Sequence, residues 1–139
     1  GVNDFGEVNI GVADGLWHYI AISWNASTIE VYLDGTRYVN NASAGTQTTG
    51  SGVLNVASNG SGEFFNGNLS FVRISNIKRY TGASISVPTT PYFINDANTV
   101  QLLLMTEGSG LTALDSSLGV NNMLLNATNP PSWSTQLPF

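Results

Sequence analysis

The feature that most constrains the fold is the stretch Leu16–Arg37, LWHYIAISWNASTIEVYLDGTR. Residues 16–24 and 28–33 alternate in polarity and are rich in aromatic and β-branched side chains, which predicts two β-strands joined by the turn 25–27. Asp34-Gly35 then matches the two-residue loop of a type I′ hairpin, in which both central residues need positive φ. The stretch therefore predicts a three-stranded antiparallel meander.

The two faces of this meander differ in polarity. We expect the face with branched aliphatic side chains to be buried in the core, and its members are Ile20, Ile22, Ile29, Val31 and Leu33. On the opposite, outer face the hairpin register places Tyr32 across from Arg37, where a tyrosine ring and a guanidinium can form a cation–π pair. These two residues are a candidate contact for a partner.

Composition supports an all-β chain. Charged residues make up 9% of the 139 residues, against roughly 25% in an average protein, and Ser, Thr, Asn and Gly replace them. Thr suits pleated strands, whereas Gly, Asn and Ser suit tight turns. We expect further strands at 52–58, 68–75, 99–105, 111–114 and 122–125, a loop at 40–52, and an extended tail from residue 130.

Charge and cysteine content exclude several classes of function. The net charge is −5, with four Lys plus Arg, so the chain lacks the basic footprint that a nucleic-acid partner requires. No apolar run approaches the ~20 residues of a membrane span, so we expect no membrane insertion. Cysteine is absent, which excludes disulfides and thiolate metal sites.

Two blocks of sequence resemble the laminin-G-like, concanavalin A-like jelly-roll superfamily. They are GLWHYIAISW with TIEVYLDGTRY, and GNLSFVRISNIKRYTGASISVPTTPYF with DANTVQLLL. The resemblance implies an antiparallel β-sandwich, which we expect to form a single domain over residues 1–139. The segment from Arg79 to Pro91 is similar to modules of bacteriophage and bacterial surface proteins.

The chain departs from this family at its start. Relatives place several strands before the Trp-His strand, but only 15 residues precede Leu16 here. We expect a sandwich that is incomplete at the N-terminus, in the C-terminal part of a longer chain. Alternatively, segments 111–125 replace those strands, since LDSSLGVNN (114–122) resembles the opening of such domains.

We expect no enzymatic activity. Some relatives are glycanases, and retaining glycanases need two carboxyl groups about 5–5.5 Å apart. The nine acidic residues include no Glu-x-Asp pair on a strand, and a turn separates Glu30 from Asp34. His18 is the one histidine, and its place in the Trp-His strand of the family implies a structural role.

No cofactor is expected, with calcium as the one open alternative. Laminin-G-like domains often bind Ca²⁺ through oxygen ligands at a loop rim. Asp14, Asp96 and Asp115 lie in expected loops or strand ends and could supply such oxygens. No Asp-x-Asp loop is present, however, and Asp14-Gly15 is also an ordinary turn pair.

Ligand binding by exposed aromatic residues is the remaining functional interpretation. Glu63-Phe64-Phe65-Asn66 places adjacent rings on a loop, so that only one ring easily faces inward, and Trp133 lies in the Pro-rich tail. Phe64, Phe65, Asn66 and Trp133 are thus candidate glycan contacts; alternatively, Phe64 and Trp133 cap the ends of the sandwich or pack against a neighbouring subunit. The five Asn-x-Ser/Thr sequons, at Asn25, Asn41, Asn59, Asn68 and Asn126, are interpreted as a consequence of composition.

The expected function is a non-enzymatic structural or attachment module of a virion, as capsid decoration or tail, or of a cell-surface protein. Its expected location is extracellular or on a virion, and its expected partners are copies of itself, other virion or surface proteins, and glycans. The alternative is a carbohydrate-binding module of a secreted enzyme or adhesin.

Overall fold

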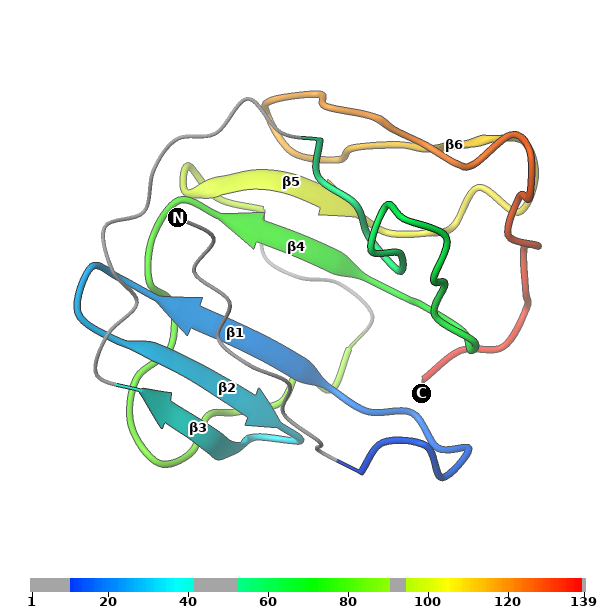
Figure 1. The fold of residues 1–139 in the computed structure, drawn as a ribbon. Helices are drawn as coiled ribbons and strands as arrows, with labels where there is room; N and C mark the ends of the chain where they lie inside the picture. The colour runs from blue at the N-terminus through cyan, green and yellow to red at the C-terminus, as the bar shows by residue number, and fades with distance from the viewer. Residues whose placement is uncertain (1–10, 42–52, 91–94, 139) are drawn as a thin grey trace. The chain divides into compact units, whose positions relative to one another are not determined.

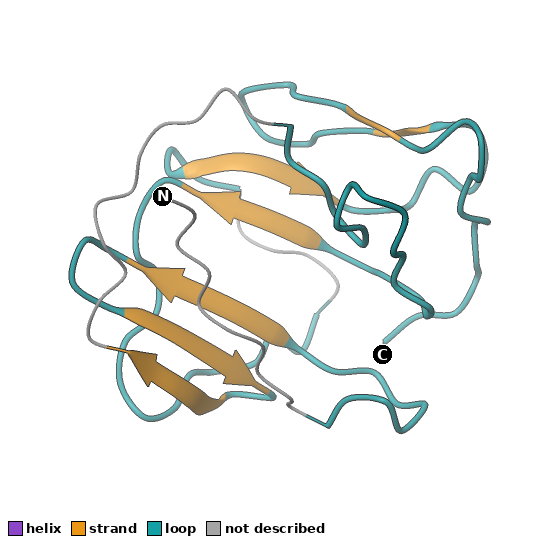
Figure 2. Cartoon of the chain, in the orientation of Figure 1, coloured by secondary structure: helices purple, strands orange, loops and turns teal. Residues whose placement is uncertain are grey.

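The computed structural model describes residues 11–41, 53–90 and 95–138. Within these residues every regular element is a β-strand, as Figure 2 shows, and no helix is long and apolar enough to cross a membrane. The described chain divides into two compact units, the first built from residues 11–41, 75–89 and 138 and the second from residues 53–74, 90 and 95–137. The all-β prediction is confirmed.

The first unit contains the meander. Strands β1 (Ile20–Trp24), β2 (Ile29–Leu33) and β3 (Thr36–Asn41) form an antiparallel sheet in the order β1-β2-β3 (Figure 1). Asp34 and Gly35 connect β2 to β3 with φ values of 47° and 84°, the left-handed conformation that the hairpin turn requires. Asn40 and Asn41, expected in a loop, extend β3, and the rest of that loop lies outside the described residues.

An asparagine determines the turn between β1 and β2. The Asn25 Oδ1 atom accepts hydrogen bonds from the backbone N–H groups of Ser27 and Thr28, both at 2.9 Å, and from the Thr28 hydroxyl at 3.2 Å. Asparagine readily folds over its own backbone in this way. Asn59 and Asn126 accept backbone N–H groups two residues on in the same manner, so three of the sequon asparagines have a role in local turns.

The face on which Ala21, Ser23, Glu30 and Tyr32 lie is buried, contrary to the expectation for the meander. Ile20 and Ile22 in β1 are 49% and 54% exposed, so their predicted place in the core is wrong. Ile29 and Leu33 are buried as predicted, and Val31 is half-buried. The reason is a covering segment, residues 78–85, which returns across the face that was expected to lie outside.

The covering segment also extends the sheet at the start of β3. Arg37 donates its N–H to the Ala83 carbonyl at 3.0 Å, and Ile85 donates its N–H to the Gly35 carbonyl at 2.8 Å. The backbones approach so closely that a Cβ at Gly35 would stand 2.6 Å from the Ile85 carbonyl oxygen. Gly35 is therefore required both by its positive φ and by this contact.

The second unit contains two strand pairs. Strand β4 (Val72–Ser75) pairs with β5 (Thr99–Leu103), and β6 (Thr112–Ala113) pairs with β7 (Met123–Leu124). All four coincide with predicted strands but are shorter, and β5 is followed by Met105 at a φ of 56°. The prediction of a strand at 52–58 is wrong where the structure describes this segment. Residues 53–58 form no strand and contribute only an isolated bridge between Ser58 and Phe64.

A buried aspartate joins β5 to the segment before β7. The Asp115 carboxylate accepts backbone N–H groups of Leu102 at 2.8 Å, Ser117 at 2.8 Å and Asn121 at 2.7 Å, and also the Ser117 hydroxyl. Burial raises the pKa of Asp115, but these hydrogen bonds outweigh burial and hold it below its ordinary value. Asp115 thus organises the LDSSLGVNN segment.

Candidate functional site

The candidate ligand contacts Phe64, Phe65 and Asn66 lie together on a short hairpin turn, residues 57–66. The turn closes through the bridge between Ser58 and Phe64 and through a 2.9 Å hydrogen bond from the Phe65 N–H to the Ala57 carbonyl. Phe64 is 51% exposed and Phe65 is 56% exposed, and Asn66 is exposed as well. Both aromatic residues are therefore accessible, which agrees with the expectation that at most one ring faces inward.

Side-chain contacts within the turn hold its shape. The Asn59 Oδ1 atom accepts the N–H groups of Ser61 at 2.8 Å and Glu63 at 3.2 Å, and the Asn59 Nδ2 atom donates to the Glu63 carboxylate at 2.5 Å. The Phe65 ring lies so close to Gly67 that a Cβ there would stand 2.8 Å from it. The exposed rings thus lie on a braced turn, which reduces the conformational entropy lost on binding.

Trp133 is held by a different segment. It is half-buried, and its indole N–H donates to the Gly110 carbonyl at 2.9 Å. Because that N–H is already used, only the faces of the indole ring remain for stacking on a ligand. Trp133 is therefore a weaker candidate contact than the Phe64–Phe65 pair.

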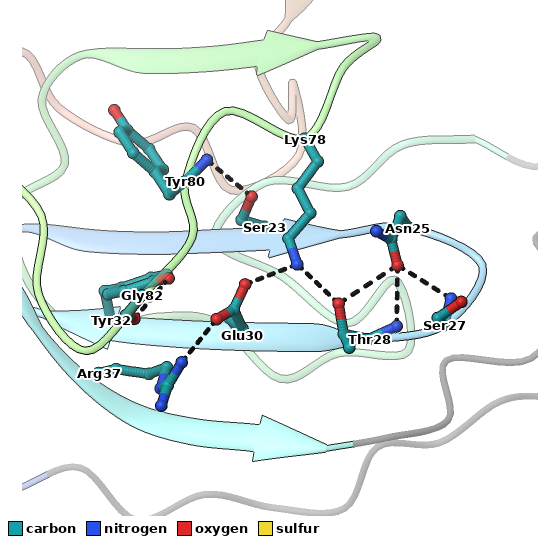
Figure 3. Close-up of polar contacts among 10 residues, drawn as sticks. All are labelled: Ser23, Asn25, Ser27, Thr28, Glu30, Tyr32, Arg37, Lys78, Tyr80 and Gly82. Carbon is teal, nitrogen blue, oxygen red and sulfur yellow. Dashed lines mark hydrogen bonds and ion pairs between the residues drawn. The ribbon is translucent and has the colours of Figure 1, made fainter.

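Tyr32 does not lie on an open face, and its predicted availability to a partner is wrong. The register that places it opposite Arg37 is confirmed, but Tyr32 is 0% exposed. Its ring meets the Tyr80 ring edge-on at a centroid distance of 6.1 Å, and its hydroxyl donates to the Gly82 carbonyl at 3.2 Å. Arg37 pairs with Glu30 at 2.8 Å (Figure 3).

Glu30 is the centre of the buried polar face shown in Figure 3. One carboxylate oxygen contacts Arg37, and the other lies 2.6 Å from the Lys78 ammonium, which also donates to the Thr28 hydroxyl at 2.6 Å. The hydrogen bond from Lys78 is the largest cause of a pKa of Glu30 below its ordinary value; burial opposes it, and the contact with Arg37 adds to it. These groups attach the covering segment to the sheet.

The three aspartates considered for calcium are occupied by hydrogen-bond donors. Asp14 accepts the Leu16 N–H and contacts His18; Asp96 accepts the Asn98 N–H and the Thr99 hydroxyl; and Asp115 accepts the donors described above. In the described ranges no group of three or more His, Cys, Asp or Glu is suited to hold a metal ion. Asp14, Asp96 and Asp115 each hold local structure through these hydrogen bonds.

His18 has a more specific role than the sequence analysis assigned to it. Its Nδ1 atom lies 2.7 Å from Asp34 Oδ2, and its Nε2 atom lies 3.0 Å from Asp14 Oδ1. The signal was present in the sequence, because a hairpin that ends at Asp34 brings this aspartate beside the start of β1. The backbone confirms the proximity, since the Asp34 N–H donates to the Tyr19 carbonyl at 2.9 Å.

A family model of the laminin G type, described as the concanavalin A-like lectin/glucanases superfamily, matches residues 3–86. This match covers more than half of the 139 residues and includes the meander and the covering segment. No curated protein and no solved structure gives a significant match. The family description includes both lectins and glucanases, which supports a carbohydrate-binding or structural module in general. The chain belongs to the concanavalin A-like lectin/glucanases superfamily.

Proposed function

We propose that this chain is a non-enzymatic attachment module that contacts glycans through the turn 57–66. The observation that carries the proposal is the exposure of Phe64 and Phe65 on a braced turn. The C–H face of a pyranose ring is apolar and packs against an aromatic ring, while exposed amides such as Asn66 bond its hydroxyl groups.

Charge limits the glycans that this turn can bind. Its one charged side chain is the acidic Glu63. Glu63 would repel an anionic glycan at the turn, so the expected ligands are neutral sugars. Low charge and abundant Ser, Thr and Asn also suit a surface that packs against copies of itself or other surface proteins.

The proposed setting is extracellular or on a virion, where the module would decorate a capsid or tail or belong to a cell-surface protein. The similarity of Arg79–Pro91 to bacteriophage and bacterial surface modules supports this setting. The non-enzymatic part of the proposal rests on the carboxylates: Glu30 and Asp115 are buried and fully engaged in structural contacts, and no acidic residue follows another at i+2 on a strand.

A neutral-glycan array tests this function. The wild type should bind at least one neutral glycan, and Phe64→Ala and Phe65→Ala should each weaken binding about tenfold, or ~1.4 kcal/mol. Val53→Ala, at an exposed residue in the same unit, is the matched control and should leave binding unchanged. Absence of binding to every glycan would favour a purely structural role, and release of reducing ends from β-glucans would show an enzyme.

The alternative of a carbohydrate-binding module in a secreted enzyme or adhesin predicts the same array result. The two settings differ in assembly, because a virion module must occur in symmetric copies on a particle. A particle map that contains this fold would support the virion setting, whereas co-purification with a hydrolase domain would support the alternative.

A further inference from the structure

A histidine placed between two carboxylates ties the residues before β1 to the β2–β3 turn. Asp34 lies in that turn and contacts His18 Nδ1 at 2.7 Å, and Asp14 lies in the preceding loop and contacts His18 Nε2 at 3.0 Å. The imidazole is largely buried, whereas both aspartate side chains remain in part solvated. One ring therefore connects two segments of the first unit.

The two contacts require a charged imidazole. A neutral imidazole has one N–H and one bare nitrogen, so it donates to one carboxylate and turns a lone pair toward the other. The imidazolium donates to both. The pKa of His18 is accordingly raised, with the Asp34 hydrogen bond as the largest cause and Asp14 next, while burial opposes them.

No other charged group competes for the ring among the described residues of this unit. The groups that face His18 are Asp14, from the preceding loop, and Asp34, from the β2–β3 turn. Arg37 and Lys78 both contact the Glu30 carboxylate, and Arg79 donates to the Ser75 hydroxyl. The protonation of His18 is therefore set by these two aspartates.

The two carboxylates differ in how firmly they are held without the histidine. Asp34 Oδ1 accepts the Tyr19 N–H at 2.8 Å, and the Asp34 N–H donates to the Tyr19 carbonyl at 2.9 Å. Asp14 has only a local bond, in which the oxygen that faces His18 also accepts the Leu16 N–H at 2.9 Å. Loss of one contact should therefore occur at Asp14.

We propose that His18 is a pH-operated latch, in which deprotonation releases Asp14 and the segment 14–16 while the bond to Asp34 persists. The remaining proton stays on Nδ1 and is donated to Asp34, and the bare Nε2 then faces the Asp14 carboxylate and repels it. Below the titration of His18 the segment 14–16 is held to the imidazole through Asp14. Above it this segment opens, and strands β1 to β3 remain paired.

NMR provides the test, because the chain has one histidine and its ring signals are unambiguous. We expect His18 to titrate above its ordinary range. The protection of the Leu16 amide, which donates to the Asp14 oxygen that faces His18, should fall as pH passes through that titration, after correction for intrinsic exchange. Each pKa unit between the closed and open forms corresponds to about a tenfold change in the opening equilibrium. Amides of β2 should stay protected.

Three variants make the test decisive. Asp14→Asn should lower the pKa of His18 and remove the pH response of Leu16, because the new amide can donate to a neutral imidazole. His18→Gln should give pH-independent exchange, and if it fails to fold, Asp14→Asn alone remains sufficient. Asp96→Asn, in the other unit, is the control and should behave as wild type. Unchanged Leu16 protection through the His18 titration, or release at Asp34 instead, would overturn the proposal.

Discussion

Replacement of Glu30 by glutamine tests the role of the buried polar face. The Glu30 side chain is 5% exposed and contacts Arg37 at 2.8 Å and Lys78 at 2.6 Å. Removing one member of a buried ion pair typically costs about 3–5 kcal/mol, because the partner charge stays buried without compensation. The Arg37 and Lys78 side chains are 26% and 15% exposed and recover some hydration, and glutamine still accepts a hydrogen bond. We therefore expect Glu30→Gln to lower the free energy of unfolding by about 2–3 kcal/mol.

Urea unfolding followed by tryptophan fluorescence, with a thermal melt, provides the assay. A loss of this size should lower Tm by roughly 10 °C in a chain of this length. Glu63→Gln is the matched control, because Glu63 is exposed on its turn, and it should change stability by less than ~0.5 kcal/mol. A double-mutant cycle with Lys78→Met isolates the pair. If Glu30→Gln destabilises no more than Glu63→Gln, the covering segment is held by something other than this carboxylate.

Three further substitutions probe other parts of the fold. Gly35→Ala should lower the free energy of unfolding in urea by roughly 2–3 kcal/mol, because the new Cβ clashes with the Ile85 carbonyl and φ is 84°. Gly15→Ala, where φ is 82° and no atom lies near the new Cβ, should lower it by only about 1 kcal/mol. Asp115→Asn should flatten the acid limb of the stability–pH curve measured by urea unfolding. The pKa of Asp115 in the folded state lies below its ordinary value, so the carboxylate stabilises the fold above that ordinary value and its contribution is lost as pH falls through the folded-state pKa. Tyr32→Phe should cost about 1 kcal/mol through loss of its hydroxyl bond, and an unchanged urea midpoint would contradict that contact.

The meander could be predicted from the sequence because its signals are local. Alternation, the Asn25 turn and Asp34-Gly35 all act within a few residues, and the register that pairs Tyr32 with Arg37 followed from them. The buried face could not be predicted in the same way. Alternation in polarity defines the two faces of the sheet, but it does not indicate which of these faces is covered by another segment of the chain. The aliphatic face was the reasonable choice for the core.

The covering segment explains that error. Glu30 looks like a solvent-facing residue until Lys78, far along the chain, neutralises it together with Arg37. Such a contact leaves no local pattern in sequence. The accessibility of Phe64 and Phe65, by contrast, was predicted in part, because two adjacent aromatic residues on a Gly- and Asn-rich turn cannot both point inward.

The return of residues 78–85 over the meander has a consequence for the newly made chain. Tyr32 and its partner Gly82 are 50 positions apart, so β1 to β3 leave the ribosome before the segment that covers them has been synthesised. At about 5–20 residues per second, this interval lasts roughly 3–10 s. During it the meander displays a glutamate that has Arg37 but not yet Lys78 as its partner, together with an uncovered tyrosine, and chaperones or nascent neighbours meet a sheet that the finished protein conceals.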